Sequence, residues 1–180
     1  MDADQIIGQT KKWIERVVMG LNFCPFAAKE FKNETIRYVV DDSDDFEINL
    51  TTLLCEFHFL DKSQFETSFL IFPNSYLDFQ DFLDLVDTGN DILHEFGYEG
   101  MYQLASFHPD YRFEGTKEND AANYTNRSPY PMLHVLREKS VENAIAQYPE
   151  VEKIPQNNEK LARKHGSPYF EDILSSIKNQ

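Results

Sequence analysis

Four short apolar segments, each rich in β-branched and aromatic residues, have the length and composition of β-strands. The sequence between the first three has helical periodicity, whereas no apolar period joins the last two. Because strands joined through a helix run parallel by a right-handed crossover, we expect the first three to run parallel, while the last two can pair antiparallel. The segments are residues 35–40, 67–72, 101–107 and 132–137.

Helical segments surround these strands. In residues 46–60, for example, Leu50, Leu53 and Phe57 recur at i, i+3 and i+7. The predicted fold class is therefore α/β or α+β, a single domain over residues 1–180 in which helices cover a mixed sheet of about four strands. The expected helices are residues 2–20, 25–31, 46–60, 78–96, 140–147, 155–165 and 168–177.

Charge and hydropathy narrow the expected partners. The net charge of −14 disfavours nucleic-acid backbones and anionic membranes as partners. No apolar run approaches the roughly 18 residues of a spanning helix, and the chain starts Met-Asp-Ala-Asp without the basic region of a signal peptide. We therefore expect a cytoplasmic protein. Residues 1–100 hold 7 basic and 20 acidic side chains and residues 101–180 hold 10 and 11, which leaves the second half room for a local positive site.

The longest segment without apolar periodicity runs from Pro109 to Pro131. Loops of this length inside a compact domain are usually functional or disordered. This one is rich in side chains that hold ligands, so we expect the functional site at its mouth. These side chains are Asp110, Tyr111, Arg112, Asn123, Tyr124, Thr125, Asn126, Arg127, Ser128 and Tyr130.

Arg127 is the leading candidate for binding a ligand. It lies in Asn-Arg-Ser-Pro-Tyr-Pro, a stretch that two prolines stiffen. A planar guanidinium on a rigid loop suits bidentate capture of a carboxylate or a phosphate. Alternatively, Arg127 pairs with Asp110, Glu114 or Asp120 and holds the loop shut. The predicted ligand-binding set is Arg127, Asn123, Asn126, Ser128, Tyr130 and Tyr111.

His108 ends one predicted strand and His134 lies in the next, so both could sit at the mouth of the loop. With Asp110 they form two imidazoles and a carboxylate, a known ligand set for a divalent metal. Without a metal, the two histidines are candidate catalytic residues for acid–base chemistry. The alternative is that His134 is a hydrogen-bonded core residue and His108 simply ends a strand.

Cys24 is the candidate nucleophile. If Pro25 starts a short helix, Cys24 lies at its N-cap, where the helix dipole stabilises a thiolate. Buried among the neighbouring aromatic residues, it would instead be an inert small hydrophobe. Cys55 is predicted to be a packing residue, and His58, His94 and His165 to be surface or hydrogen-bonded residues.

The sequence contains no dinucleotide-binding, P-loop, zinc-protease, esterase or EF-hand motif.

Three sequence blocks resemble a known family. Residues 20–27, 105–111 and 123–138 are similar to a family of uncharacterised bacterial proteins, catalogued as domain of unknown function 1415. The resemblance extends from the first helix to about Leu161. It implies a bacterial, single-domain protein and supplies no activity.

The leading hypothesis is a small-molecule enzyme or binder for an anionic ligand, with its site at the mouth of residues 109–131. A divalent metal could assist, and the reaction would be hydrolysis or group transfer. The alternative is a non-catalytic interaction protein that docks through Tyr111, Tyr124 and Tyr130. A weaker alternative is a thiol-dependent redox protein that uses Cys24. No sequence feature specifies an oligomeric state.

Overall fold

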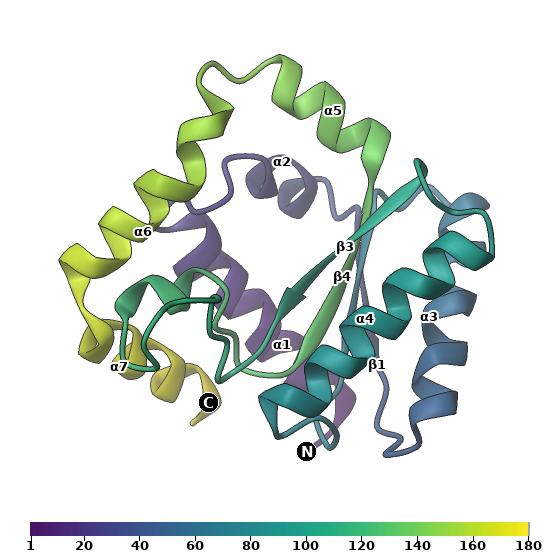
Figure 1. Cartoon of the computed structure of the whole chain (residues 1–180), viewed down its shortest axis with the longest axis horizontal. Helices are drawn as coiled ribbons and strands as arrows, with labels where there is room; N and C mark the ends of the chain where they lie inside the picture. The colour runs from purple at the N-terminus through teal and green to yellow at the C-terminus, as the bar shows by residue number, and fades with distance from the viewer. Residues whose placement is uncertain (180) are drawn as a thin grey trace.

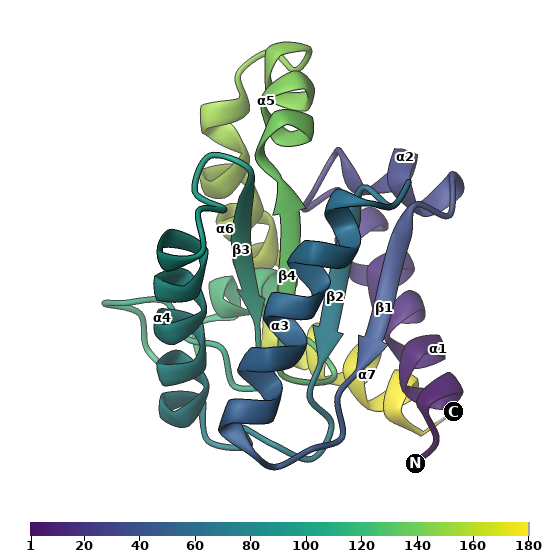
Figure 2. The same ribbon diagram turned by 90° about the vertical axis from the view of Figure 1, so that its right-hand side faces the viewer.

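The computed structural model, which describes residues 1–179, is built on one open sheet of four strands. Their spatial order is β1-β2-β4-β3, as Figure 2 shows from right to left. β1 and β2 run parallel, and β4 is antiparallel to both β2 and β3. The strands are β1 Ile36–Val40, β2 Thr67–Ile71, β3 Tyr102–Phe107 and β4 Met132–Arg137.

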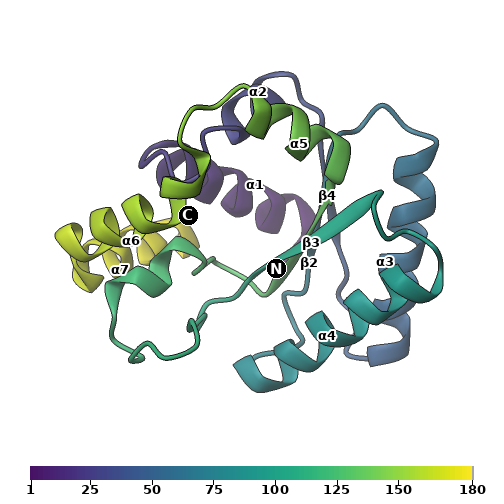
Figure 3. The same cartoon turned by 45° about the horizontal axis from the view of Figure 1, so that its top comes forward.

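Helices cover both faces of the sheet (Figures 1 and 3). α3 and α4 lie on one face, and α1 and α7 lie on the other with α6 beside them. The predicted fold class, helices packed on a mixed four-stranded sheet, is therefore confirmed. The helices are α1 Ala3–Trp13, α2 Ala27–Lys32, α3 Phe46–Asp61, α4 Phe79–Glu95, α5 Glu138–Ala146, α6 Ile154–His165 and α7 Ser167–Lys178. No helix among residues 1–179 is long and apolar enough to cross a bilayer.

The position of β4 departs from the order of the strands along the chain. The prediction that the last two strands can pair antiparallel is confirmed, and β3 runs in the same direction as β2. β4 lies between them, so the two do not pair. Met132 of β4 packs in one apolar cluster while Leu133 and Val135 pack in the other. A strand that is apolar on both faces belongs in the centre of a sheet.

Each face of the sheet has its own aromatic core. On the α1 face, Trp13 makes edge-on contacts with Phe69 and Phe107, with ring centroids 6.4 and 5.1 Å apart. On the α3 and α4 face, Phe57 and Phe82 are fully buried. Edge-on aromatic pairs add to the stabilisation that burial provides.

Aspartate side chains cap the starts of α1, α3 and α4, whereas α2 has no side-chain cap. Asp45 accepts hydrogen bonds from Glu47 N and Ile48 N at 2.9 and 3.1 Å and so begins α3. The predicted helix over residues 25–31 instead begins at Ala27, with Phe26 as its N-cap. The prediction that Cys24 caps this helix is therefore wrong. The predicted helix over residues 2–20 is α1 followed by a π-helix, η1 Ile14–Met19.

Three loops meet at one edge of the sheet. Because β1, β2 and β3 point the same way, their C-terminal ends lie at the same edge. Ser75, in the loop after β2, donates to Ser43 O after β1 at 2.6 Å. The ring of His108, after β3, lies 2.7 Å from Tyr76 O. In open α/β sheets, this edge is where ligands usually bind.

Candidate ligand-binding site

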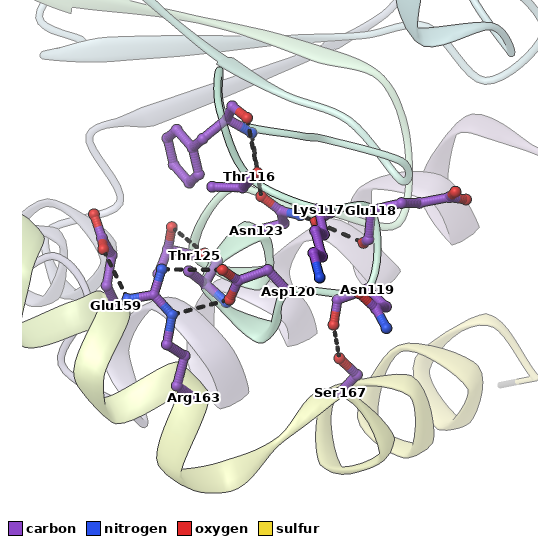
Figure 4. Close-up of polar contacts among 12 residues, drawn as sticks. Thr116, Lys117, Glu118, Asn119, Asp120, Asn123, Thr125, Glu159, Arg163 and Ser167 are labelled. Carbon is purple, nitrogen blue, oxygen red and sulfur yellow. Dashed lines mark hydrogen bonds and ion pairs between the residues drawn. The ribbon is translucent and has the colours of Figure 1, made fainter.

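Asn123 lies at the centre of the loop between β3 and β4. It belongs to a short 3₁₀-helix, η2 Ala121–Thr125, and its side chain is fully buried. Its amide oxygen accepts from Phe113 N at 3.1 Å and from Thr116 Oγ1 at 2.8 Å. Its amide nitrogen donates to the carbonyls of Lys117 and Glu118 at 2.9 and 3.4 Å (Figure 4). One side chain thus uses all of its hydrogen-bonding capacity to hold residues 113–118.

Arg127 holds the same loop. Its Nε donates to Tyr111 O at 3.2 Å, and its Nη2 donates to Glu118 O at 2.9 Å. Its guanidinium carbon lies 4.6 Å from the centroid of the Tyr124 ring. The alternative that Arg127 holds the loop is therefore correct, but its hydrogen-bond partners are backbone carbonyls rather than the carboxylates that we predicted.

The C-terminal helices hold the loop from outside. Asp120 forms two hydrogen bonds of 3.0 Å each with the guanidinium of Arg163 on α6 (Figure 4). Ser167, at the start of α7, donates to Asn119 O at 3.1 Å. The bonds from Arg163 and from Ala122 N favour the charged carboxylate and so lower the pKa of Asp120 below its ordinary value.

Three more residues of the predicted ligand-binding set, Asn126, Ser128 and Tyr130, are hydrogen-bonded within the protein. Asn126 donates to Ser106 O at 3.2 Å, and Ser128 donates to Tyr130 O at 2.6 Å. The Tyr130 hydroxyl donates to Gln9 of α1. Tyr124 and Tyr130 are only 4% and 6% exposed. The prediction that they form a docking surface with Tyr111 is therefore wrong for both.

The structure does not bring His108 and His134 together. His134 pairs with Ala105 across the β3–β4 ladder and stacks on Phe69, with ring centroids 3.8 Å apart, on the α1 face. His108 packs between Phe79 and Phe82 of α4, at 5.2 Å from each, on the opposite face. The expectation that both histidines face the mouth of the loop is wrong.

Both nitrogens of the buried His108 ring are engaged. Nε2–H donates to Tyr76 O, since a carbonyl only accepts, and Nδ1 accepts from Asp110 N at 2.9 Å. Protonation of Nδ1 would remove the acceptor of this hydrogen bond and bring its new N–H into repulsive contact with the N–H of Asp110. Burial is the main cause of a pKa below the ordinary value for histidine, although Asp110 and Asp78 oppose this shift. These contacts hold His108 neutral, as a structural residue.

His134 is also a hydrogen-bonded core residue. Thr67 donates its hydroxyl to Val135 O, so His134 Nε2–H donates to Thr67 Oγ1 at 2.5 Å. Burial lowers the pKa of His134 to about 3. Within residues 1–179 no three His, Cys, Asp or Glu side chains are arranged to hold a metal ion. His108, Asp110 and His134 therefore do not form the predicted metal site.

The environment of Cys24 agrees with the alternative of a buried, unreactive thiol, whereas the prediction for Cys55 is wrong. Cys24 is partly buried, and burial raises the pKa of its thiol, opposed by the backbone N–H groups of Phe26 and Ala27. This shift is opposite to the one that activates a nucleophilic thiol. Cys55 is exposed rather than packed. His58, His94 and His165 are exposed, as predicted.

A groove of about 510 Å³ lies between the start of α4 and residues 111–116. Three of the lining residues are aromatic and contact one another: the centroid of the Tyr111 ring lies 5.3 Å from that of Phe79 and 4.9 Å from that of Phe113. Figure 2 shows the segment after β3 reaching out past α4. The size is typical of small-molecule sites. The lining residues are Phe79, Gln80, Leu83, Tyr111, Arg112, Phe113, Glu114, Gly115 and Thr116.

Three polar side chains of the groove form no hydrogen bond or ion pair with the rest of the described residues. Across residues 1–179, the side chains of Gln80, Arg112 and Glu114 have no hydrogen bond or ion pair to another side chain or to the backbone. All three are exposed. Arg112 was among the predicted ligand-holding residues of the loop, although Arg127 was the leading candidate. Gln80 and Phe79 were not predicted, because nothing in the sequence of α4 indicates that its first turn lies beside residues 111–116.

The comparisons with known proteins give a family but no function. Neither the curated proteins nor the solved structures contain a match to the chain. The model of the family described as protein of unknown function DUF1415 matches residues 5–172. This match agrees with the resemblance carried by residues 20–27, 105–111 and 123–138, and the chain belongs to the DUF1415 family.

Proposed function

We propose that the protein binds a small organic anion in the groove between α4 and residues 111–116. The observation that supports this most is Arg112, an exposed guanidinium in the lining whose hydrogen bonds are unused within residues 1–179. A free guanidinium is suited to bidentate binding of a carboxylate or a phosphate. Phe79, Tyr111 and Phe113 line the same groove and would pack against the apolar part of the ligand.

The rigidity of the loop supports this proposal. Asn123 and Arg127 hold the backbone of residues 111, 113, 117 and 118. A wall that is already ordered loses little conformational entropy when a ligand binds. Asn123 and Arg127, which were predicted to bind the ligand, therefore contribute indirectly by fixing the segment that carries Arg112, whereas Tyr111 of the same predicted set lines the groove itself.

The chemistry of the lining favours binding over acid–base catalysis by histidine. The nine lining residues include no histidine, cysteine or serine. The nearby His108 packs against Phe79, and both of its nitrogens are occupied. A general base needs to reach the proton that it removes within about 2.6–3.2 Å, or through one water molecule.

Titration with phenylacetate, a small aromatic carboxylate, tests this function. Backbone amide NMR signals of residues 79–83 and 111–116 should shift on addition of the probe. Arg112→Gln should weaken binding about fivefold to tenfold, because it removes a charged donor from a partly solvated site. Lys164→Gln, which removes an exposed cation on α6 outside the groove, is the matched control and should bind like wild type. Shifts confined to other segments, or equal affinity in Arg112→Gln, would overturn the proposal.

A further inference from the structure

We propose that the ligand of this groove is a zwitterion, in which an ammonium group and a carboxylate are attached to an aromatic or flat apolar body. The inference rests on the proposed function and narrows it to a ligand class. Arg112 would bind the carboxylate, Glu114 the ammonium group, and the aromatic wall the apolar body. α-Amino acids with aromatic side chains are the simplest members of this class.

The first argument is the presence of two opposite charges that do not neutralise each other. Arg112 and Glu114 are separated by Phe113, and all three line the groove. Although two residues apart, Arg112 and Glu114 form no ion pair with each other or with any other side chain of residues 1–179. A cation and an anion that both remain available in one groove are complementary to a ligand carrying both charges.

The second argument is the negative electrostatic field around the groove. α4, which forms one wall, carries five acidic residues, Asp81, Asp84, Asp87, Asp91 and Glu95, and no lysine or arginine. Between Lys62 and Arg112 the chain contains no basic residue other than histidine. A ligand with only a negative charge would approach Arg112 against this field, whereas an ammonium group on the same ligand offsets the repulsion.

The third argument is the geometry of the rings. Tyr111 is inclined at 57° to Phe79 and at 67° to Phe113. All three rings belong to residues that line the groove, so the body of a bound molecule would contact them. An aromatic body can pack edge-to-face against them, and an ammonium group near a ring face gains a cation–π interaction.

Three probes that share one aromatic ring separate the charges. L-Phenylalanine carries both groups, phenylacetate carries only the carboxylate, and phenethylamine carries only the ammonium group. The affinity of each probe is measured by NMR titration of wild type, Arg112→Gln, Glu114→Gln and Glu95→Gln. Glu95→Gln removes an exposed carboxylate at the far end of α4 and controls for the loss of one negative charge.

We expect L-phenylalanine to bind wild type more tightly than either single-charge probe. Glu114→Gln should weaken the binding of L-phenylalanine about two- to fivefold, which is the effect of losing one partly exposed ion pair. It should not weaken the binding of phenylacetate. Arg112→Gln should weaken the binding of both probes that carry a carboxylate. Glu95→Gln should leave the order of the three affinities unchanged. All variants alter exposed side chains, and their thermal midpoints verify that they fold.

The outcomes separate this inference from the proposed function. If phenylacetate binds through Arg112 but Glu114→Gln leaves the preference for L-phenylalanine unchanged, the zwitterion inference is wrong and the anion site stands. If phenethylamine equals L-phenylalanine and Arg112→Gln has no effect, both proposals are wrong. If no probe shifts residues 79–83 and 111–116 at millimolar concentration, both are also overturned.

Discussion

At the scale of single residues, side chains that look suited to ligands are used to hold their own backbone. Asn123 bonds four partners inside the loop, and Arg127 bonds two carbonyls. A 23-residue connection without regular strands leaves many backbone groups unpaired, and buried ones must find partners. Polar side chains on such a loop are therefore used first for hydrogen bonds to the loop backbone, and fewer remain available to bind a ligand.

His134 makes the stability of the protein depend on pH. Its pKa is about 3 in the folded state, below the value of about 6.5 in an unfolded chain. The unfolded state therefore binds more protons between these pH values, and the free energy of unfolding falls as pH drops below about 6.5. Between pH 6 and pH 5, protonation of His134 in the unfolded state should lower the free energy of unfolding by about 1 kcal/mol.

Urea unfolding at pH 7.5, 6 and 5 measures this effect. His134→Gln keeps a side-chain N–H donor but cannot titrate, so it should lose about 1 kcal/mol less than wild type between pH 6 and 5. His58→Gln, at an exposed position on α3, should keep the wild-type slope. Equal slopes in wild type and His134→Gln would contradict a buried neutral histidine.

At the scale of elements, the end of the first helix depends on one glycine. η1 ends at Met19, and the N–H of its C-cap residue Gly20 donates to Glu15 O at 2.9 Å, five residues back. A Cβ at Gly20 would lie 2.5 Å from the backbone oxygen of Arg16. A π-helical turn is wider than an α-helical one, and here its carbonyl lies where a side chain would begin. Sequence periodicity predicted one helix over residues 2–20 and did not distinguish its two parts.

Two alanine substitutions test this requirement. Gly20→Ala should lower the free energy of unfolding by about 1–3 kcal/mol, because a backbone atom must move. Gly8→Ala, inside α1 with no atom within 4 Å of the added Cβ, should raise it by up to about 1 kcal/mol through helix propensity. Urea midpoints measure both. A Gly20→Ala variant as stable as Gly8→Ala would show that η1 tolerates a side chain there.

At the scale of the whole molecule, charge is distributed unevenly over the fold. The net charge is −14, and residues 1–100 hold 20 of the 31 acidic residues. In the second half of the chain, Arg163 pairs with Asp120 and connects α6 to the loop (Figure 4). Repulsion among many like charges destabilises a compact state, and dissolved salt screens it over roughly 10 Å at 0.1 M.

Salt should therefore stabilise the protein at neutral pH. Raising NaCl from 20 to 300 mM at pH 7.5 should raise the thermal midpoint by about 3 °C, the shift that about 1 kcal/mol produces in a domain of this size. Near pH 4.7, where the net charge approaches zero, the same addition should have little effect. A midpoint that falls with salt at pH 7.5 would mean that screened ion pairs outweigh the repulsion.

Most secondary structure follows from local sequence. The positions of the four strands and of α3, α4, α6 and α7 agree with the predicted segments to within one or two residues at each end. The periodicity of apolar residues and the aspartates that begin α3 and α4 account for this agreement, because both act between residues close in sequence. The mixed character of the sheet followed from the helix between one pair of strands and its absence between another.

The candidate site was predicted less well, because it depends on contacts between distant segments. Alternation along a strand correctly grouped His108 with Leu104 and His134 with Met132. The register between β3 and β4, which pairs His134 with Ala105, then placed the two histidines on opposite faces. The groove likewise exists only where α4 meets residues 111–116.

The sequence alone determined the elements, the mixed sheet and the family, because each depends on short-range patterns or on motifs within the chain. Tertiary structure alone decided the order of the strands, the faces of the histidines and the use of each polar group in the loop. The physical reason is that buried hydrogen-bonding groups must be paired. Which of them pair internally, and which remain for a ligand as Arg112 and Glu114 do, depends on which segments meet in space.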